Sequence, residues 1–256
     1  MTEFSRAVVR LPGDSLSKGL SSTPGGQSPD PGKARQQHGA YVNALETLGL
    51  EVDILPAEES FPDAVFVEDT AVFMGPGVMI TRPGAPSRLG EAAKIAPHIA
   101  GLGIEMITMR PPGTLDGGDV LLVDNVFFVG MSARTNREGL RQFTAAAQRF
   151  GFATRPVPLA AGLHLKSGLS LVGEKLLLAA PGCGEDSAFC ELNLVYTPPE
   201  EAYAANCVLV NGTVLAASGY PRTREILTAR GCRVMTLDVG EFRKVDGGLS
   251  CLSLRF

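Results

Sequence analysis

The feature that most constrains this chain is an internal repeat. A polar segment leads into two short apolar strands joined by a tight turn, a helix and a third strand follow, and the pattern starts again. The polar segments end near Asp69, Asp119, Leu169, Asn206 and Cys251, so the repeats recur every 37 to 50 residues. A period of this length is typical of solenoids and propellers, whose units bury their apolar faces against one another.

The last repeat is one strand short, because the chain ends soon after Cys251. Residues 8–14 match the register of residues 79–85, so the missing strand is expected at the N-terminus, over residues 6–10. We therefore predict a single catalytic domain over residues 1–256. Its fold class is α/β: a five-unit pseudo-symmetric α/β propeller of ββαβ repeats, closed by pairing of the N- and C-terminal strands, with Cys251 in the latter. An open α/β sheet with loosely similar halves is the alternative.

Composition excludes several classes of function. The 256 residues are 45% hydrophobic and 20% charged, and the formal net charge is −4. We expect no nucleic-acid or membrane partner, because both favour a basic face and no apolar run reaches membrane-spanning length. The first twelve residues lack the apolar core of a signal peptide, and the five cysteines form no C-x-x-C pair, so we expect a cytoplasmic protein. The three histidines show no metal-ligand spacing, so no metal is expected.

The polar segments of a ring of units face a common axis, and here they carry groups with chemistry. A thiol with an imidazole in reach, oriented by a carboxylate, is the arrangement for nucleophilic catalysis. Acidic groups around them raise one another's pKa values, which makes sense if the ligand is a cation. Each residue alone also has a structural interpretation, and it is the combination that favours catalysis. The groups are Asp63, Glu68, Asp69, Asp116, Asp119, His164, Asn206, Asp246 and Cys251.

Six stretches of the sequence form an ordered set of motifs. They are residues 61–69 (FPDAVFVED), 113–119 (GTLDGGD), 132–136 (SARTN), 163–166 (LHLK), 219–224 (GYPRTR) and the end of the chain from Val245 to Cys251. With this set, which is far more specific than any one motif, the sequence resembles the dimethylarginine dimethylaminohydrolases, of the guanidino-group-modifying superfamily that also contains arginine deiminases and amidinotransferases. The resemblance covers essentially the whole chain. The family fold is a five-unit α/β propeller, in agreement with the repeat.

The resemblance assigns roles to individual residues. It implies Cys251 as the nucleophile, His164 as general acid and base, and Asp116 as the carboxylate that orients the imidazole, a position where some family members carry Glu. The implied substrate contacts are Glu68 and Asp69 to the guanidinium, Arg88 and Arg134 to the α-carboxylate, and Asp63 with the carbonyls of Leu20 and Val245 to the α-amino end. Asp246, in the matching end of the chain, joins the candidate substrate-binding set.

The implied reaction is hydrolysis of Nω-methylated arginine, a small-molecule substrate, to citrulline and methylamine or dimethylamine, without a cofactor. The Gly- and Ser-rich residues 11–32 suit a lid over such a site. Arginine deiminase-like or amidinotransferase activity on another guanidino compound, and a non-catalytic amino-acid-binding module, remain alternatives, and a homodimer stays open. Arginine deiminases carry a helical insertion for which this chain has no room.

Overall fold

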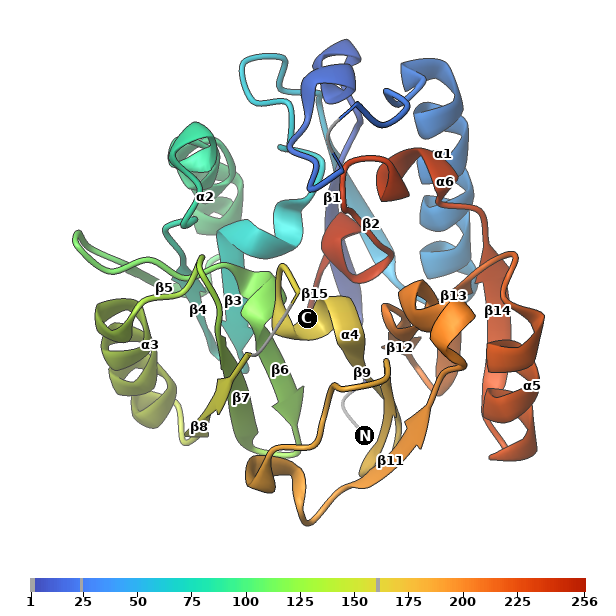
Figure 1. Ribbon diagram of the computed structural model, residues 1–256. Coiled ribbons are helices and arrows are strands. Elements are labelled where there is room, and N and C mark those ends of the chain that lie inside the picture. The colour runs from blue at the N-terminus through green and yellow to red at the C-terminus, as the bar shows by residue number, and fades with distance from the viewer. Residues whose placement is uncertain (1–2, 24, 160–161) are drawn as a thin grey trace.

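The computed structural model describes residues 3–23, 25–159 and 162–256, and in this part of the chain fifteen strands form five three-stranded sheets (Figure 1). The strands are β1 (Arg6–Arg10), β2 (Glu51–Leu55), β3 (Ala71–Met74), β4 (Gly77–Ile80), β5 (Glu105–Thr108), β6 (Val120–Val123), β7 (Val126–Met131), β8 (Ala153–Pro158), β9 (Leu169–Gly173), β10 (Leu176–Ala179), β11 (Asn193–Tyr196), β12 (Val208–Val210), β13 (Thr213–Ala217), β14 (Arg233–Leu237) and β15 (Leu254–Arg255).

Helices and short 3₁₀ turns connect the strands. The helices are α1 (Pro31–Thr47), α2 (Glu91–Gly101), α3 (Arg137–Arg149), α4 (Leu165–Gly168), α5 (Pro221–Ala229) and α6 (Gly240–Arg243). The 3₁₀ turns are η1 (Asp14–Lys18), η2 (Val67–Thr70), η3 (Pro86–Arg88), η4 (Gly117–Asp119), η5 (Ser187–Phe189), η6 (Pro199–Ala205) and η7 (Ser250–Leu252).

All five sheets have the same topology, as the repeat predicts. In the sheet β3-β4-β5, for example, β3 pairs antiparallel with β4, and β4 pairs parallel with β5 after the α2 crossover. The parallel step needs a connection of a dozen or more residues, and a helix usually supplies it. The third sheet, β9-β10-β11, departs from the predicted ββαβ unit, because its crossover contains only the 3₁₀ turn η5.

The fifth sheet joins the two ends of the chain. Its order is β15-β1-β2, and β15 pairs antiparallel with β1 through Ala7 opposite Arg255 and Val8 opposite Leu254. The predicted pairing of the terminal strands is therefore confirmed. The prediction that Cys251 lies in that strand is wrong: the backbone N–H of Cys251 donates to Gly248 in the turn η7, and β15 begins only at Leu254.

The chain's local signals act as expected at α1. Asp30 accepts a hydrogen bond from the Lys33 backbone N–H as the N-cap, and Pro31 occupies the first turn. The helix therefore begins at Pro31, directly after its capping residue. Gly49, with φ of 92°, follows its end in the left-handed conformation that glycine tolerates best.

The described residues form five hydrophobic clusters, and each is shared by two neighbouring sheets. For example, Val8 of β1 packs in one cluster with Ile80 of β4, and Phe128 of β7 packs with Leu177 of β10. The longer helices α1, α2, α3 and α5 lie on the outside, while the C-terminal strand β15 lies near the centre (Figure 1). Removing one unit would thus expose apolar faces of both neighbours, which ties the stability of the units together.

The polar segments that lead into the first strand of each sheet meet in the interior. Neighbouring segments touch in the order η7, η2, η4, α4 and η6, and the side chain of Asn206, just after η6, bonds Ser250 of η7.

No helix in the described part of the chain has the length and apolar character needed to cross a membrane.

A buried histidine on α1 should make the free energy of unfolding depend on pH. His38 on α1 is 1% exposed, its Nε2 has no hydrogen-bond partner among the described residues, and burial lowers its pKa to about 4. Below pH 6.5 the unfolded chain binds a proton that the folded protein rejects, so stability falls as the pH drops toward 4, by up to about 3 kcal/mol.

We therefore expect His38→Leu to reduce the loss of unfolding free energy between pH 7 and pH 4, measured by urea unfolding. His98→Leu is the matched control, because His98 is partly exposed beside Asp53. The idea fails if the two variants show the same pH dependence.

Candidate active site

A pocket of about 190 Å³ opens between the polar segments and the loop that follows η1. It contains nine of the predicted site residues; among the described residues the lining does not include Asp116 or Glu68. The lining residues are Leu20, Ser21, Ser22, Asp63, Phe66, Asp69, Arg88, Arg134, Leu163, His164, Val245, Asp246, Gly247 and Cys251. Residues more than 200 positions apart in sequence thus meet at one place.

Asp116 lies directly behind the imidazole of His164. Its Oδ2 is 2.9 Å from His164 Nε2, and its Oδ1 accepts a hydrogen bond from the Gly84 backbone N–H at 2.7 Å. Asp116 is 0% exposed and His164 is 6% exposed, so both carboxylate oxygens are bound in a water-poor setting. This fixes the ring and leaves Nδ1 as the nitrogen not bonded to Asp116.

The two glycines after Asp116 make this approach feasible. A Cβ on Gly118 would lie 2.7 Å from His164 Nδ1, and a Cβ on Gly117 would lie 1.9 Å from the Glu68 carbonyl oxygen. The next residue, Asp119, accepts from the Leu165 backbone N–H and from the hydroxyls of Ser132 and Thr135. The stretch Asp116–Asp119 is therefore built to hold the segment that begins at His164.

The charges around the pocket favour an imidazolium. Burial alone would lower the pKa of His164, but the negative charge of Asp69 and the bond to Asp116 outweigh it and raise this pKa to about 9. Burial likewise opposes ionisation of Asp69, yet the charges of His164 and Arg88 hold the pKa of that carboxyl well below its usual range.

Cys251 is a neutral thiol in this setting. Burial and the nearby negative charges of Glu68 and Asp69 raise its pKa to about 12. A cation bound against these carboxylates would offset them and favour the thiolate. The ionisation of Cys251 therefore depends on whether a positively charged group occupies the pocket.

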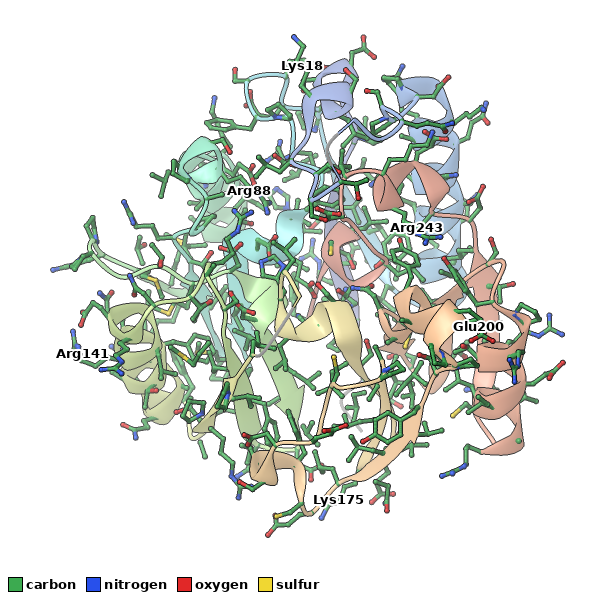
Figure 2. All side chains as sticks on the ribbon, in the orientation of Figure 1. Lys18, Arg88, Arg141, Lys175, Glu200 and Arg243 are labelled. Carbon is green, nitrogen blue, oxygen red and sulfur yellow. The ribbon has the colours of Figure 1, made fainter. Side chains whose placement is uncertain are left out.

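The two predicted carboxylate-binding arginines differ in freedom. Arg88 is 5% exposed and donates to Asp69, to both oxygens of Glu91, and to the carbonyls of Asp63 and Phe66. It lies inside the molecule, whereas Lys18, Arg141 and Lys175 lie at its outline (Figure 2). The guanidinium of Arg134 makes no hydrogen bond to any described residue, which leaves all its donors for a ligand.

Two acidic residues of the pocket accept hydrogen bonds from the loop predicted as a lid. The Leu20 backbone N–H donates to Asp63 Oδ1 at 3.0 Å, and Ser22 donates to Asp246 through both its backbone N–H and its hydroxyl. Asp246 has a φ of 57°, an uncommon conformation for a residue other than glycine. The first turn of the predicted lid region is the 3₁₀ segment η1.

With this geometry in place, the chain can be compared with known proteins. Residues 30–187 match the family described as "N,N dimethylarginine dimethylhydrolase, eukaryotic". The N(G),N(G)-dimethylarginine dimethylaminohydrolase of Pseudomonas aeruginosa is 43% identical over 256 residues, covering 99% of this chain and 100% of the relative. The Streptomyces coelicolor protein of the same name is 37% identical and covers 98% of this chain and 96% of the relative.

A solved structure agrees. A mutant of the P. aeruginosa enzyme complexed with citrulline superposes with a TM-score of 0.96 at 42% identity, covering 100% of both chains. This chain belongs to the dimethylarginine dimethylaminohydrolase family. The family resemblance predicted from the motifs is thereby confirmed, and with it the α/β fold that this family shares.

Within this family member, several site residues escaped the sequence analysis. Phe66, Leu163 and Gly247 line the pocket, and a Cβ on Gly247 would lie 2.3 Å from the Phe66 ring. All three residues lie inside the matching motifs, but the resemblance assigned them no role. The positions of Asp116 and Glu68 behind the pocket walls could not be read from their spacing, because both depend on contacts between different units.

The side chains of Asp69, Asp116 and His164 are also of types that bind metal ions. One ligand atom from each lies within 4.8 Å of the others, and all three residues are buried. The same geometry satisfies a protonated imidazole between two carboxylates, which the raised pKa of His164 favours. The expectation of a metal-free, cofactor-free site stays a prediction.

The His164–Asp116 pair predicts an NMR result that does not depend on activity. Asp116→Asn removes the charge that accepts from Nε2, so the pKa of His164 should fall from about 9, by roughly one unit or more. Titration of the imidazole Cε1–H signals would measure it. The His98 signal is the internal reference, and Asp124→Asn, on an exposed turn, is the control. An unchanged His164 titration in Asp116→Asn would contradict the assigned pair.

Proposed function

We propose that this protein hydrolyses Nω-methylated arginine to citrulline and methylamine or dimethylamine. The observation that carries the proposal is a single pocket that holds the Cys251 thiol, the His164 imidazole backed by Asp116, and the carboxylate of Asp69. The relatives named dimethylarginine dimethylaminohydrolase, and the neighbour complexed with citrulline, support the same reaction.

The first half of the reaction forms a covalent intermediate. The substrate guanidinium enters beside Asp69 and lowers the pKa of Cys251, whose thiol proton is lost to solvent. The resulting thiolate attacks the central guanidinium carbon. His164, protonated in the free site, gives a proton to the departing methylamine or dimethylamine as the carbon–nitrogen bond breaks. The product of this step is a cationic S-alkyl thiouronium on Cys251, stabilised by the surrounding carboxylates.

The second half releases citrulline. Neutral His164 takes a proton from water, and the resulting hydroxide adds to the thiouronium carbon. The carbon–sulfur bond breaks, the added hydroxyl gives its proton to the departing Cys251 sulfur, and the former guanidinium carbon becomes the ureido carbonyl of citrulline. The site returns to a neutral thiol and a protonated His164. Because Nε2 is bonded to Asp116, Nδ1 is the nitrogen we assign to both proton transfers.

The rest of the pocket holds the amino-acid end of the substrate. Arg134 and Arg88 are assigned to the α-carboxylate, with Arg134 supplying most of the free donors. Asp63, Asp246 and the carbonyls of Leu20 and Val245 are assigned to the α-ammonium group. Asp69 is the direct partner of the guanidinium, and Glu68 is assigned to it from behind the pocket wall.

We also propose that residues 1–256 form one catalytic domain, a five-unit α/β propeller closed at β15 and β1. The shared hydrophobic clusters and the Asn206–Ser250 bonds between units support it. The partner that we assign to this domain is its small-molecule substrate. All five cysteines are free thiols, which supports the cytoplasm as the place of action.

The test is an assay of citrulline and amine release from arginine, monomethylarginine, asymmetric dimethylarginine and agmatine. We expect methylarginines to be turned over, and Cys251→Ser to lose activity by about 10⁴-fold or more while keeping its fold. Cys190→Ser, at an exposed site, should be silent. Turnover of arginine alone would indicate a deiminase, capture of the amidino group by added glycine an amidinotransferase, and ligand binding without amine release a binding module.

If Arg134 binds the α-carboxylate of the substrate, its removal should affect mainly substrates that carry this group. Arg134→Ala should raise KM for methylarginine by about 10- to 100-fold, because a charged hydrogen bond is lost. The effect on agmatine, which lacks the carboxylate, should be much smaller. Arg137→Ala, on the exposed start of α3, is the control. Equal losses on both substrates would show that Arg134 acts structurally.

A further inference from the structure

A second cavity lies behind the nucleophile, on the far side of the polar segments from the substrate pocket. Its volume is about 480 Å³, and its walls are the first strands of the sheets, β3, β6, β9, β12 and β15. Glu68, Lys166, Ser250 and Arg255 also line it. Three of these residues are next to, or two positions from, site residues: Glu68 precedes Asp69, Lys166 follows His164 by two, and Ser250 precedes Cys251.

These residues form a closed circuit of hydrogen bonds with Asn206. Lys166 Nζ donates to Glu68 Oε1 at 2.6 Å, and Ser250 Oγ donates to Glu68 Oε2 at 2.9 Å. The Ser250 backbone N–H donates to Asn206 Oδ1 at 3.0 Å, and Asn206 Nδ2 donates to the Lys166 carbonyl at 3.0 Å. The circuit begins at the Lys166 side chain and returns to the Lys166 backbone.

The circuit joins segments from four different units. It links the segment that carries His164 to the turn that carries Cys251, and both to the segment that carries Asp69. In an α/β fold assembled from separate units, the distance between nucleophile and imidazole depends on such cross-links. Lys166 takes part in the circuit twice, through its side-chain ammonium and through its backbone carbonyl.

The circuit also sets the charge behind the thiol. Glu68 is 4% exposed, and its Oε1 faces the ammonium of Lys166 and, at 3.4 Å, the guanidinium of Arg255. Arg255 is additionally bound to the carbonyls of Ser250 and Ser253. Without Lys166, the buried Glu68 charge would face the thiol with one counter-charge fewer, which disfavours the thiolate.

We propose that Lys166 is a positioning residue for the nucleophile, holding the Cys251 turn against the His164 segment through Glu68 and Ser250 and balancing the Glu68 charge from the second cavity. This deepens the proposed function and rests on it for the kinetic readout. Lys166 lies outside the lining of the substrate pocket among the described residues, so it acts through its neighbours. Glu68, assigned above to the guanidinium, on this view serves the reaction through Ser250 as well.

The kinetic arm compares Lys166→Met with Lys166→Arg. We expect Lys166→Met to lower kcat about 10- to 100-fold with KM changed by no more than about threefold, because the substrate contacts stay in place. Lys166→Arg keeps a donor and a charge toward Glu68 and should recover most of kcat. Lys175→Met, at the rim of the same cavity but outside the circuit, should behave as wild type. Equal losses in the Met and Arg variants would overturn the proposal.

The second arm needs no substrate turnover. The rate of iodoacetamide alkylation at Cys251, followed by mass spectrometry of its peptide at pH 8.5, reports the thiolate fraction. Lys166→Met should slow it about three- to tenfold, and adding Glu68→Gln in the same protein should restore it, because the unbalanced charge is then gone. A wild-type alkylation rate in Lys166→Met, or no recovery in the double variant, would overturn the proposal.

The two arms separate this inference from the proposed function. If wild-type protein released no citrulline from any methylarginine, the proposed function would fail while the alkylation rates still tested Lys166. If turnover were normal and the alkylation rates were insensitive to Lys166, the positioning role alone would fail.

Discussion

The constraint on which this structure depends is that no unit buries its own core. Each of the five hydrophobic clusters draws side chains from two neighbouring sheets, and the pairing of β15 with β1 supplies the sheet that the last unit needs. The polar segments at the inner ends of the sheets are therefore held close together as a consequence of packing. A catalytic site can be assembled there from residues such as Asp69, His164 and Cys251, which lie far apart in sequence.

Local patterns predicted the pairs of apolar strands joined by tight turns. Short-range preferences also account for the Asn211-Gly212 turn, with its left-handed Asn211, and for the end of α1 before Gly49. They do not account for the turn at Cys251, because Asn206, 44 residues before Ser250, binds Ser250 and helps hold this segment out of the strand. The missing helix in the third unit likewise reflects a short crossover that the strand pattern alone did not reveal.

The sequence predicted those residues of the candidate site that belong to the family motifs. Cys251, His164 and Asp116 were named from motif matches; the structure places Asp116 Oδ2 2.9 Å from His164 Nε2, and the roles of all three residues stay predictions. Spacing alone did not place Glu68 behind the wall or Asp116 behind the imidazole. It also could not show that Arg88 is nearly saturated by Asp69 and Glu91 whereas Arg134 is free, because those contacts depend on how η2, η3 and α2 pack.

The charge balance of the pocket explains how a buried cysteine can be both inert and reactive. Carboxylates on two sides raise the pKa of the Cys251 thiol, and the same Asp69 charge helps keep His164 protonated, so the resting pair is a neutral thiol with an imidazolium. A guanidinium bound between them would lower the pKa of the thiol again, because its positive charge offsets the carboxylates next to the sulfur. His164 would stay protonated. In the proposed mechanism, the thiolate that attacks and the imidazolium that protonates the leaving amine are then present together. On this proposal a neutral ligand of the same shape would fill the pocket without producing the thiolate, so the substrate would be selected by its charge as well as its shape.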